Sequence, residues 1–181
     1  GRSLHHIVHR TASAGEVLRT GWWTSAELEV PERAARFWLR PQTTVRLAAD
    51  SPGVLLVVER GMLRAAFGAM SGEEAAERLV ATPSAVLAVR GTHYGVEVSS
   101  GGHTTVVVFE GVVEVLDIAR QGPPVLVPAG QACSIRPGKH PEPPDSHRRT
   151  PRDWDRGTSR GPGSDGRGEP GTQSSTTSPS S

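Results

Sequence analysis

The sequence predicts an all-β fold, an antiparallel sandwich or roll of about ten to twelve short strands followed by a disordered tail. Three observations predict it. Runs of β-branched and aliphatic residues recur along the first three quarters of the chain. Turn residues rich in Gly, Pro and Ser separate these runs, about every 8 to 12 residues. The last 44 residues contain a single apolar side chain, Trp154.

Residues 1–14 are expected to be a lead-in strand or a flexible segment, and residues 15–137 to form the β domain. In the β domain about 45% of residues are apolar, an ordinary fraction for a globular core. The expected strands are Ala26–Val30, Phe37–Leu39, Thr44–Leu47, Val54–Val58, Leu63–Phe67, Ala85–Val89, Tyr94–Val98, Thr104–Phe109, Val112–Leu116, Val125–Val127 and Ala132–Ile135.

Two glycine turns are expected to join three of these strands into a meander. Gly101-Gly102 separates 94–98 from 104–109, and Glu110-Gly111 separates 104–109 from 112–116. Glycine supplies the positive φ that tight hairpin turns need. One short helix is plausible after Ser71, with Glu74 at capping-box spacing, and a loop there is equally consistent with the sequence.

A weak internal repeat relates residues 57–64 to residues 107–114 at an offset of 50 positions. The shared pattern is a strand, an acidic residue, a glycine and a second strand. Two such units would stack as similar halves of one β structure, although chance similarity between two β-hairpins explains the pattern as well.

Residues 138–181 are interpreted as a disordered tail. They contain seven Gly and seven Pro and end in Ser-Ser-Thr-Thr-Ser-Pro-Ser-Ser. Such a segment has too little apolar surface to offset the entropy of ordering it.

The charge balance argues against nucleic acid as a partner, because the formal net charge is only +1. The Arg-Gly pairs of the tail are diluted by acidic residues. The single cysteine, Cys133, excludes an intramolecular disulfide and a multi-cysteine zinc site. No run of apolar residues is long enough to cross a membrane, and no signal peptide is present in the sequence.

No cofactor, metal or catalytic site is expected. His5, His6 and His9 form an HHxxH pattern without the glutamate of a metalloprotease, and His93 and His103 flank a strand without the pattern of a cupin site. There is no Gly-x-Ser-x-Gly nucleophile motif, and Gly101-Gly102 lies between two strands rather than in a phosphate-binding loop. Cys133 lies in an apolar strand pattern and is expected to be a buried thiol.

Trp22 and Trp23 are candidate partner contacts. Adjacent residues on a strand point to opposite faces, so one indole is expected to anchor the core and the other to be exposed. An exposed Trp is a typical protein or glycan contact. Packing alone is the other interpretation of the pair.

Several motifs occur in an order and spacing that resemble one known family, the FecR-type extracytoplasmic domain, over residues 15–136. Most specific is the order Thr-x-x-Ala, Gly-Thr-x-aromatic-x-Val and Val-x-x-Glu-Gly-x-Val. The segments that carry the resemblance are 15–21, 26–30, 39–47, 58–61, 80–85, 89–98, 106–115 and 127–131.

Within these motifs six residues are expected to have structural roles: Gly61, Thr82, Gly91, Thr92, Gly111 and Gly130. Gly91 and Gly111 fall where a turn or bulge needs a residue without Cβ. The Thr92 hydroxyl is expected to satisfy a backbone group exposed at that turn. Gly61 is expected in a turn after Val58.

The resemblance implies a non-enzymatic, periplasmic or otherwise extracytoplasmic binding and sensing module. In the best-understood members, such a domain relays the state of an outer-membrane TonB-dependent transporter to an anti-sigma segment and an extracytoplasmic-function sigma factor. The expected partner is a protein, an envelope receptor or regulator, which often adds a strand to an open sheet edge. The alternative is a structural or scaffold module of the cell envelope that binds glycan or protein without signalling.

Overall fold

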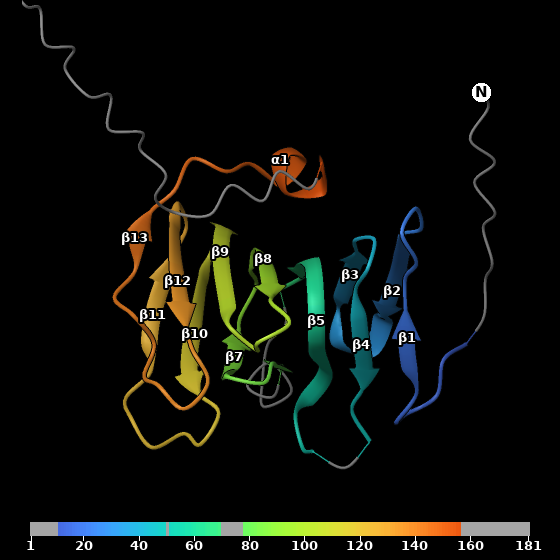
Figure 1. Ribbon diagram of the computed structural model, residues 1–181, viewed down its shortest axis with the longest axis horizontal. Coiled ribbons are helices and arrows are strands. Elements are labelled where there is room, and N and C mark those ends of the chain that lie inside the picture. The colour runs from blue at the N-terminus through green and yellow to red at the C-terminus, as the bar shows by residue number, and fades with distance from the viewer. Residues whose placement is uncertain (1–10, 50, 70–77, 157–181) are drawn as a thin grey trace, which may run out of the picture.

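The prediction of an all-β fold is confirmed (Figure 1). Most described strands coincide with expected ones. The strands Val17–Arg19, Leu79–Ala81 and Asp145–Ser146 are not among those expected, and the expected strands 54–58 and 63–67 are one continuous strand. The computed structural model describes residues 11–49, 51–69 and 78–156. The helix expected after Ser71, the HHxxH segment and residues 157–181 lie outside the described residues.

The structure contains these elements in chain order: β1 (Val17–Arg19), β2 (Ala26–Val30), the 3-10 turn η1 (Pro31–Arg33), β3 (Ala35–Leu39), β4 (Thr44–Leu47), β5 (Val54–Phe67), β6 (Leu79–Ala81), β7 (Ala85–Val89), β8 (His93–Val98), β9 (Thr104–Glu110), β10 (Val112–Asp117), β11 (Val125–Pro128), β12 (Gln131–Ile135), β13 (Asp145–Ser146) and α1 (Pro151–Arg156).

One continuous sheet folds over on itself to make two halves. The first half has the strand order β1-β4-β5-β6-β7-β10-β11. The second has the order β2-β3-β5-β8-β9-β12-β13. The long strand β5 belongs to both. Among the described strands, only β5 and β6 pair in parallel. This differs from the expected antiparallel arrangement.

The core lies between the two halves and is made by alternate side chains of each strand. In β5 the buried side chains are Leu56 and Val58 before Gly61, and Leu63, Ala65 and Phe67 after it. The alternation therefore shifts by one residue at Glu59-Arg60-Gly61. A bulge of this kind lets one strand face the core from first one half and then the other.

Gly61 is required at this crossing for two reasons. Its φ is +100°, and a Cβ there would lie 2.5 Å from Thr43 Cα. Thr43 is fully buried, and its hydroxyl donates to the Met62 carbonyl (2.9 Å) and accepts from the Met62 amide (3.1 Å). The Gly61 turn expected from the sequence is therefore wrong, because β5 passes through this residue without reversing.

Gly111 marks a second crossing. The hairpin at Gly101-Gly102 is confirmed by the pairing of β8 with β9, but the second hairpin of the expected meander is not formed. β9 pairs with β8 and β12, whereas β10 pairs with β7 and β11, so the chain changes halves at Gly111. Its φ is +77°, and a Cβ would lie 2.9 Å from the Gly91 carbonyl oxygen.

The internal repeat corresponds to these two crossings. Val58 and Val108 are buried before the glycines, and Leu63 and Val113 are buried after them, at the same offset of 50 positions. β5 crosses from the first half to the second, and β9–β10 crosses back. The sequence pattern does not distinguish a crossing from a hairpin, because both need a strand, a glycine and another strand.

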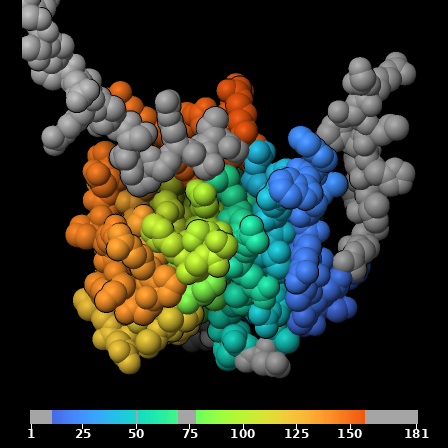
Figure 2. All heavy atoms as spheres, in the orientation of Figure 1, coloured from blue at the N-terminus to red at the C-terminus, as the bar shows by residue number. Residues whose placement is uncertain are grey.

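Residues 138–156 belong to the folded structure, although the sequence placed them in the tail. They include β13, which pairs with β12, and α1, which contacts β5 and β8. Figure 2 shows the lighter orange residues on the side of the molecule away from the blue residues of β1 and β2, and the deepest orange residues at the top of the view.

Replacing Gly61 by Ala is expected to lower the free energy of unfolding by about 2 to 4 kcal/mol, because a left-handed φ and an overlap with backbone add together. Gly130 is a matched control, since its φ is +83° but a Cβ would meet nothing within 4 Å. Gly130→Ala is expected to cost only about 1 kcal/mol. Urea denaturation of both variants measures the difference, and equal losses would show that the Gly61 contact with Thr43 is unimportant.

Candidate binding surface

Thr82 lies in a buried network of hydroxyl groups that joins the two halves. The Ser84 hydroxyl donates to Thr104 Oγ1 (2.8 Å), which donates to Thr82 Oγ1 (2.8 Å). Thr82 Oγ1 accepts from the Ala85 amide (2.9 Å) and so shapes the turn between β6 and β7. All three hydroxyl residues are almost completely buried, so this motif braces the fold and presents nothing to a ligand.

The structure brings Gly91, Thr92 and Gly111 together. The Thr92 methyl group lies 2.9 Å from where a Gly111 Cβ would be. Thr92 Oγ1 is buried and has no hydrogen-bond partner among the described residues, so the expected hydroxyl bond to backbone is wrong. Thr92 packs with its methyl group instead. Gly130 follows Ala129, whose amide donates to the Gly111 carbonyl (2.9 Å), and its own amide donates to the Val108 carbonyl (2.9 Å).

Trp22 and Trp23 lie in the turn between β1 and β2, and both indoles are exposed, by 74% and 96% respectively. The expectation that one of them anchors the core is therefore wrong. The reason is that they are not on a strand, so strand alternation does not apply to them. Two adjacent, exposed indoles make a large apolar surface that no part of the described chain covers.

Hydrogen bonds fix the base of this turn. The Gly21 amide donates to Thr24 Oγ1 (2.6 Å), and the Gly21 carbonyl accepts from the Gln42 amide (3.1 Å). The Thr20 hydroxyl donates to the Arg40 carbonyl (2.6 Å). The two indoles are therefore presented from a braced turn beside the loop that joins β3 to β4. The backbone at the base of the turn is thus fixed before a partner binds, which lowers the entropic cost of ordering it on binding.

An open hollow of about 470 Å³ lies next to this loop. The β3–β4 loop, the middle of β5, the end of β8 and the β8–β9 turn enclose it. Its lining residues are Arg40, Pro41, Gln42, Arg60, Gly61, Met62, Glu97, Val98, Ser99 and Ser100. The sequence analysis did not identify this hollow, because its residues come from four separate segments and no motif connects them.

β2 is an edge strand beside the Trp22–Trp23 turn. Among the described strands it pairs only with β3, so its other side carries unpaired backbone groups. Arg36 on β3 forms ion pairs with Glu27 (3.3 Å) and with Glu29 on this edge. These charged side chains lie on one face of the strand and leave its backbone edge free.

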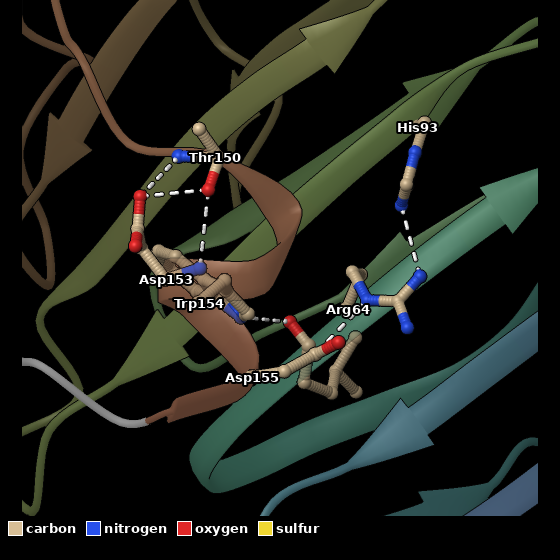
Figure 3. Close-up of polar contacts among 7 residues, drawn as sticks. Arg64, His93, Thr150, Asp153, Trp154 and Asp155 are labelled. Atoms are coloured by element: carbon tan, nitrogen blue, oxygen red, sulfur yellow. Dashed lines mark hydrogen bonds and ion pairs between the residues drawn. The ribbon is translucent and has the colours of Figure 1, made fainter.

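Residues 138–156 form a segment that we call the strap, and its helix α1 packs against β5 and β8 (Figure 3). Trp154 is only 2% exposed. Its indole Nε1 donates to the Leu63 carbonyl (2.9 Å), and its ring lies over Gly95, where a Cβ would be 2.4 Å from the indole. Gly95 thus forms the floor of a slot for one indole ring.

A capping box begins α1. The Thr150 hydroxyl donates to Asp153 Oδ2 (2.7 Å), and the Asp153 amide donates back to Thr150 Oγ1 (3.2 Å). Pro151 occupies the first helical position, where a missing N–H costs nothing. Thr150-Pro151-x-Asp153 before a lone Trp is the sequence signal that identifies this helix, and the composition of the tail obscured it.

Arg64 on β5 holds the strap in place. Its Nε donates to Asp155 Oδ1 (3.0 Å), and its guanidinium stacks over the Trp38 ring at 3.8 Å. Its Nη1 lies 3.1 Å from His93 Nε2, as Figure 3 shows. Burial, with a smaller effect from the Arg64 cation, lowers the pKa of His93 from its ordinary value. The neutral imidazole is therefore the form that fits beside Arg64.

The structure offers little for catalysis. Among the described residues, no group of three or more His, Cys, Asp or Glu side chains could hold a metal ion. His93 and His103 lie at opposite ends of the β8–β9 hairpin. Burial raises the pKa of the Cys133 thiol to about 11, and the thiol donates to the Glu142 carbonyl (3.1 Å). No helix in the described ranges has the length and apolar character of a membrane span.

A family model described as FecR protein matches residues 16–114, more than half of the chain. The chain belongs to the FecR family. The resemblance seen in the sequence motifs is thereby confirmed. Five of the six motif residues and both exposed indoles of this FecR chain lie within the match, whereas Gly130 and the strap lie beyond it.

Two crystal structures of a protein titled "putative anti-sigma factor" from Parabacteroides distasonis share the fold of this FecR chain. Their TM-scores are 0.55 and 0.54, at 16% and 17% identity, and each alignment covers 72% of this chain. It covers 59% of the other protein, so the FecR chain spans about three fifths of that length. No curated protein matches the sequence.

Trp154→Ala is expected to lower the free energy of unfolding by about 3 kcal/mol, because it empties a buried indole site and releases its hydrogen bond. Trp22→Ala is the matched control and is expected to change stability by less than about 0.5 kcal/mol, since that indole is exposed. Thermal and urea denaturation measure both. Equal effects of the two substitutions would contradict a docked strap.

Stability is expected to fall as the pH drops from 7 to 5. Unfolded histidine titrates near pH 6.5, and the lowered pKa of His93 means that the unfolded state binds the extra proton first. The stabilising contribution of neutral His93 is therefore complete above pH 6.5 and is lost as the pH falls below it. His93→Gln is expected to flatten the stability–pH profile, and an unchanged slope in that variant would contradict this role.

Proposed function

We propose that this FecR-family chain is a non-enzymatic binding and sensing module that acts outside the cytoplasm and receives a protein partner at the Trp22–Trp23 turn. The observation that carries the proposal is the exposure of both indoles on a turn whose base is fixed by hydrogen bonds. Trp residues in such positions are typical binding hot spots.

The open edge of β2 supports the same location. A partner strand that pairs with β2 would run next to the two indoles, and main-chain hydrogen bonds would add to the affinity. The hydroxyls of the Thr82 network are buried and bonded to one another, and the raised pKa of the Cys133 thiol disfavours the reactive thiolate. Neither group supports a catalytic role. The fold thus supplies a rigid support, and recognition takes place at one end of it.

Signalling to an extracytoplasmic-function sigma factor is the role that we propose for this binding. Membership of the FecR family and the fold shared with a protein titled as an anti-sigma factor support it. In this role the partner is an envelope receptor or regulator whose state the module reads through the indole turn.

The Trp22→Ala, Trp23→Ala double variant tests the proposal. Envelope proteins from the cells of origin are applied to immobilised wild-type and variant chains, and the retained proteins are quantified by mass spectrometry. The retained amount of at least one envelope protein is expected to be lower by about tenfold or more on the double variant. The reason is that loss of a Trp hot spot costs roughly 2 kcal/mol or more of binding free energy. Leu126→Ala, at another exposed apolar residue, is the control and is expected to retain it.

A scaffold module that binds glycan is the second candidate function, and the same indoles favour it because aromatic rings also stack on sugars. Retention of the wild-type chain on purified peptidoglycan, lost in the double variant, would favour the glycan function over the protein-binding one. Identical retention of every envelope protein by wild type and double variant would contradict the proposed partner site.

A further inference from the structure

The hollow beside the Trp22–Trp23 turn carries an unusual arrangement of charge. Two guanidinium groups, Arg40 and Arg60, and one carboxylate, Glu97, line it. No ion pair to either arginine is present among the described residues. Elsewhere on the sheet, Arg36, Arg46 and Arg64 each pair with a carboxylate. Glu59, which precedes Arg60 in the chain, is bound to Arg46 and so does not neutralise its neighbour.

Arg40 is held in place before any ligand binds. Its amide donates to the Met62 carbonyl (2.9 Å), and its carbonyl accepts from the Thr20 hydroxyl (2.6 Å). Its side chain is half-buried, and Nε is buried without a hydrogen-bond partner in the described part of the chain. The Arg40 guanidinium therefore lines the hollow with no carboxylate of the described chain to neutralise it, and a ligand carboxylate would supply that partner.

The chemistry of the lining selects the ligand. Guanidinium groups bind carboxylates strongly because their parallel N–H groups match the two oxygens. Glu97 in the same hollow disfavours a polyanion such as nucleic acid or an anionic membrane, and the net charge of +1 provides no long-range field for one. Two arginines and one glutamate leave the hollow one positive charge in excess, which a single ligand carboxylate would neutralise.

The indoles determine what lies next to that carboxylate. Gln42 lines the hollow, and its amide donates to the carbonyl of Gly21, the residue before Trp22. The turn that carries the two exposed indoles is therefore joined by a hydrogen bond to a residue that lines the hollow. A peptide that places Asp or Glu in the hollow would place a neighbouring apolar side chain against the indoles.

We propose that the hollow between the β3–β4 loop, the middle of β5 and the β8–β9 turn binds an acidic peptide segment of the protein partner. Arg40 and Arg60 bind its carboxylate, and Trp22 and Trp23 contact the adjacent apolar residue. This inference rests on the proposed function, since it specifies the chemistry of the protein that the module recognises.

Selection from a phage-displayed library of random dodecapeptides on the immobilised full chain tests the inference. Wild type is expected to select peptides enriched in Asp or Glu next to an aromatic or aliphatic residue. Arg60→Glu reverses the charge of an exposed side chain and is expected to shift the selection toward Lys and Arg. Arg90→Glu, at an exposed arginine outside the hollow, is the matched control and is expected to leave the selection unchanged.

A fluorescein-labelled copy of one selected peptide then gives the affinities by anisotropy. Arg60→Glu and Arg40→Gln are each expected to raise the Kd by about tenfold or more, the range for a lost charge-assisted hydrogen bond. Added salt is expected to weaken wild-type binding as well. Far-ultraviolet circular dichroism of each variant confirms that the sheet is intact.

Three results would overturn the inference: selection without acidic residues, an acidic preference that survives Arg60→Glu, or no selected peptide at all. Peptides without acidic residues that are lost in the Trp22→Ala, Trp23→Ala variant would overturn it while leaving the proposed partner site in place. Failure of the proposed function is seen separately, as unchanged retention of envelope proteins by that double variant.

Discussion

The fold depends on two places where a strand passes from one half of the sheet to the other without a side chain in the way. At Gly61 and at Gly111 the backbone has a positive φ, and a Cβ would overlap Thr43 or the Gly91–Thr92 backbone. Each crossing shifts the alternation of buried residues by one position. The two halves therefore both direct their apolar side chains to one shared core, which a flat sheet of the same sequence would leave exposed.

The residues that hold the halves together are distinct from those available to a partner. Thr82, Ser84 and Thr104 join the halves through buried hydroxyl groups, and such a network is stable only because each hydroxyl is paired. The exposed indoles and the unpaired arginines lie at a different place, beside the loop that joins β3 and β4. Gly61 belongs to both regions. Its missing side chain leaves room for the buried Thr43, and the same residue lines the hollow.

The strap extends the folded unit past the region that the family model matches. Three contacts attach its helix α1 to the sheet: the Trp154 indole fills the slot over Gly95, its Nε1 donates to the Leu63 carbonyl, and Arg64 pairs with Asp155. The Arg64 side chain of this pair is only slightly exposed, whereas the Asp155 side chain is open to solvent. The single large apolar residue of this polar segment fills a matching site on the sheet, and the pairing of β13 with β12 adds backbone hydrogen bonds.

The sequence by itself determined the all-β class, most of the strand positions and the family, because alternation and turn residues act over a few neighbouring positions. It missed the short strands β1, β6 and β13 and divided β5 into two. It also indicated that Gly61 and Gly111 lie in the same local pattern, between one strand and the next. The tertiary structure alone decided whether each glycine turned the chain back or passed it to the other half, since both outcomes use the same local pattern. It likewise decided that both Trp22 and Trp23 are exposed, that Trp154 is buried, and that Arg40 and Arg60 line one hollow. Each of these depends on contacts between residues far apart in the chain, which local propensity does not encode.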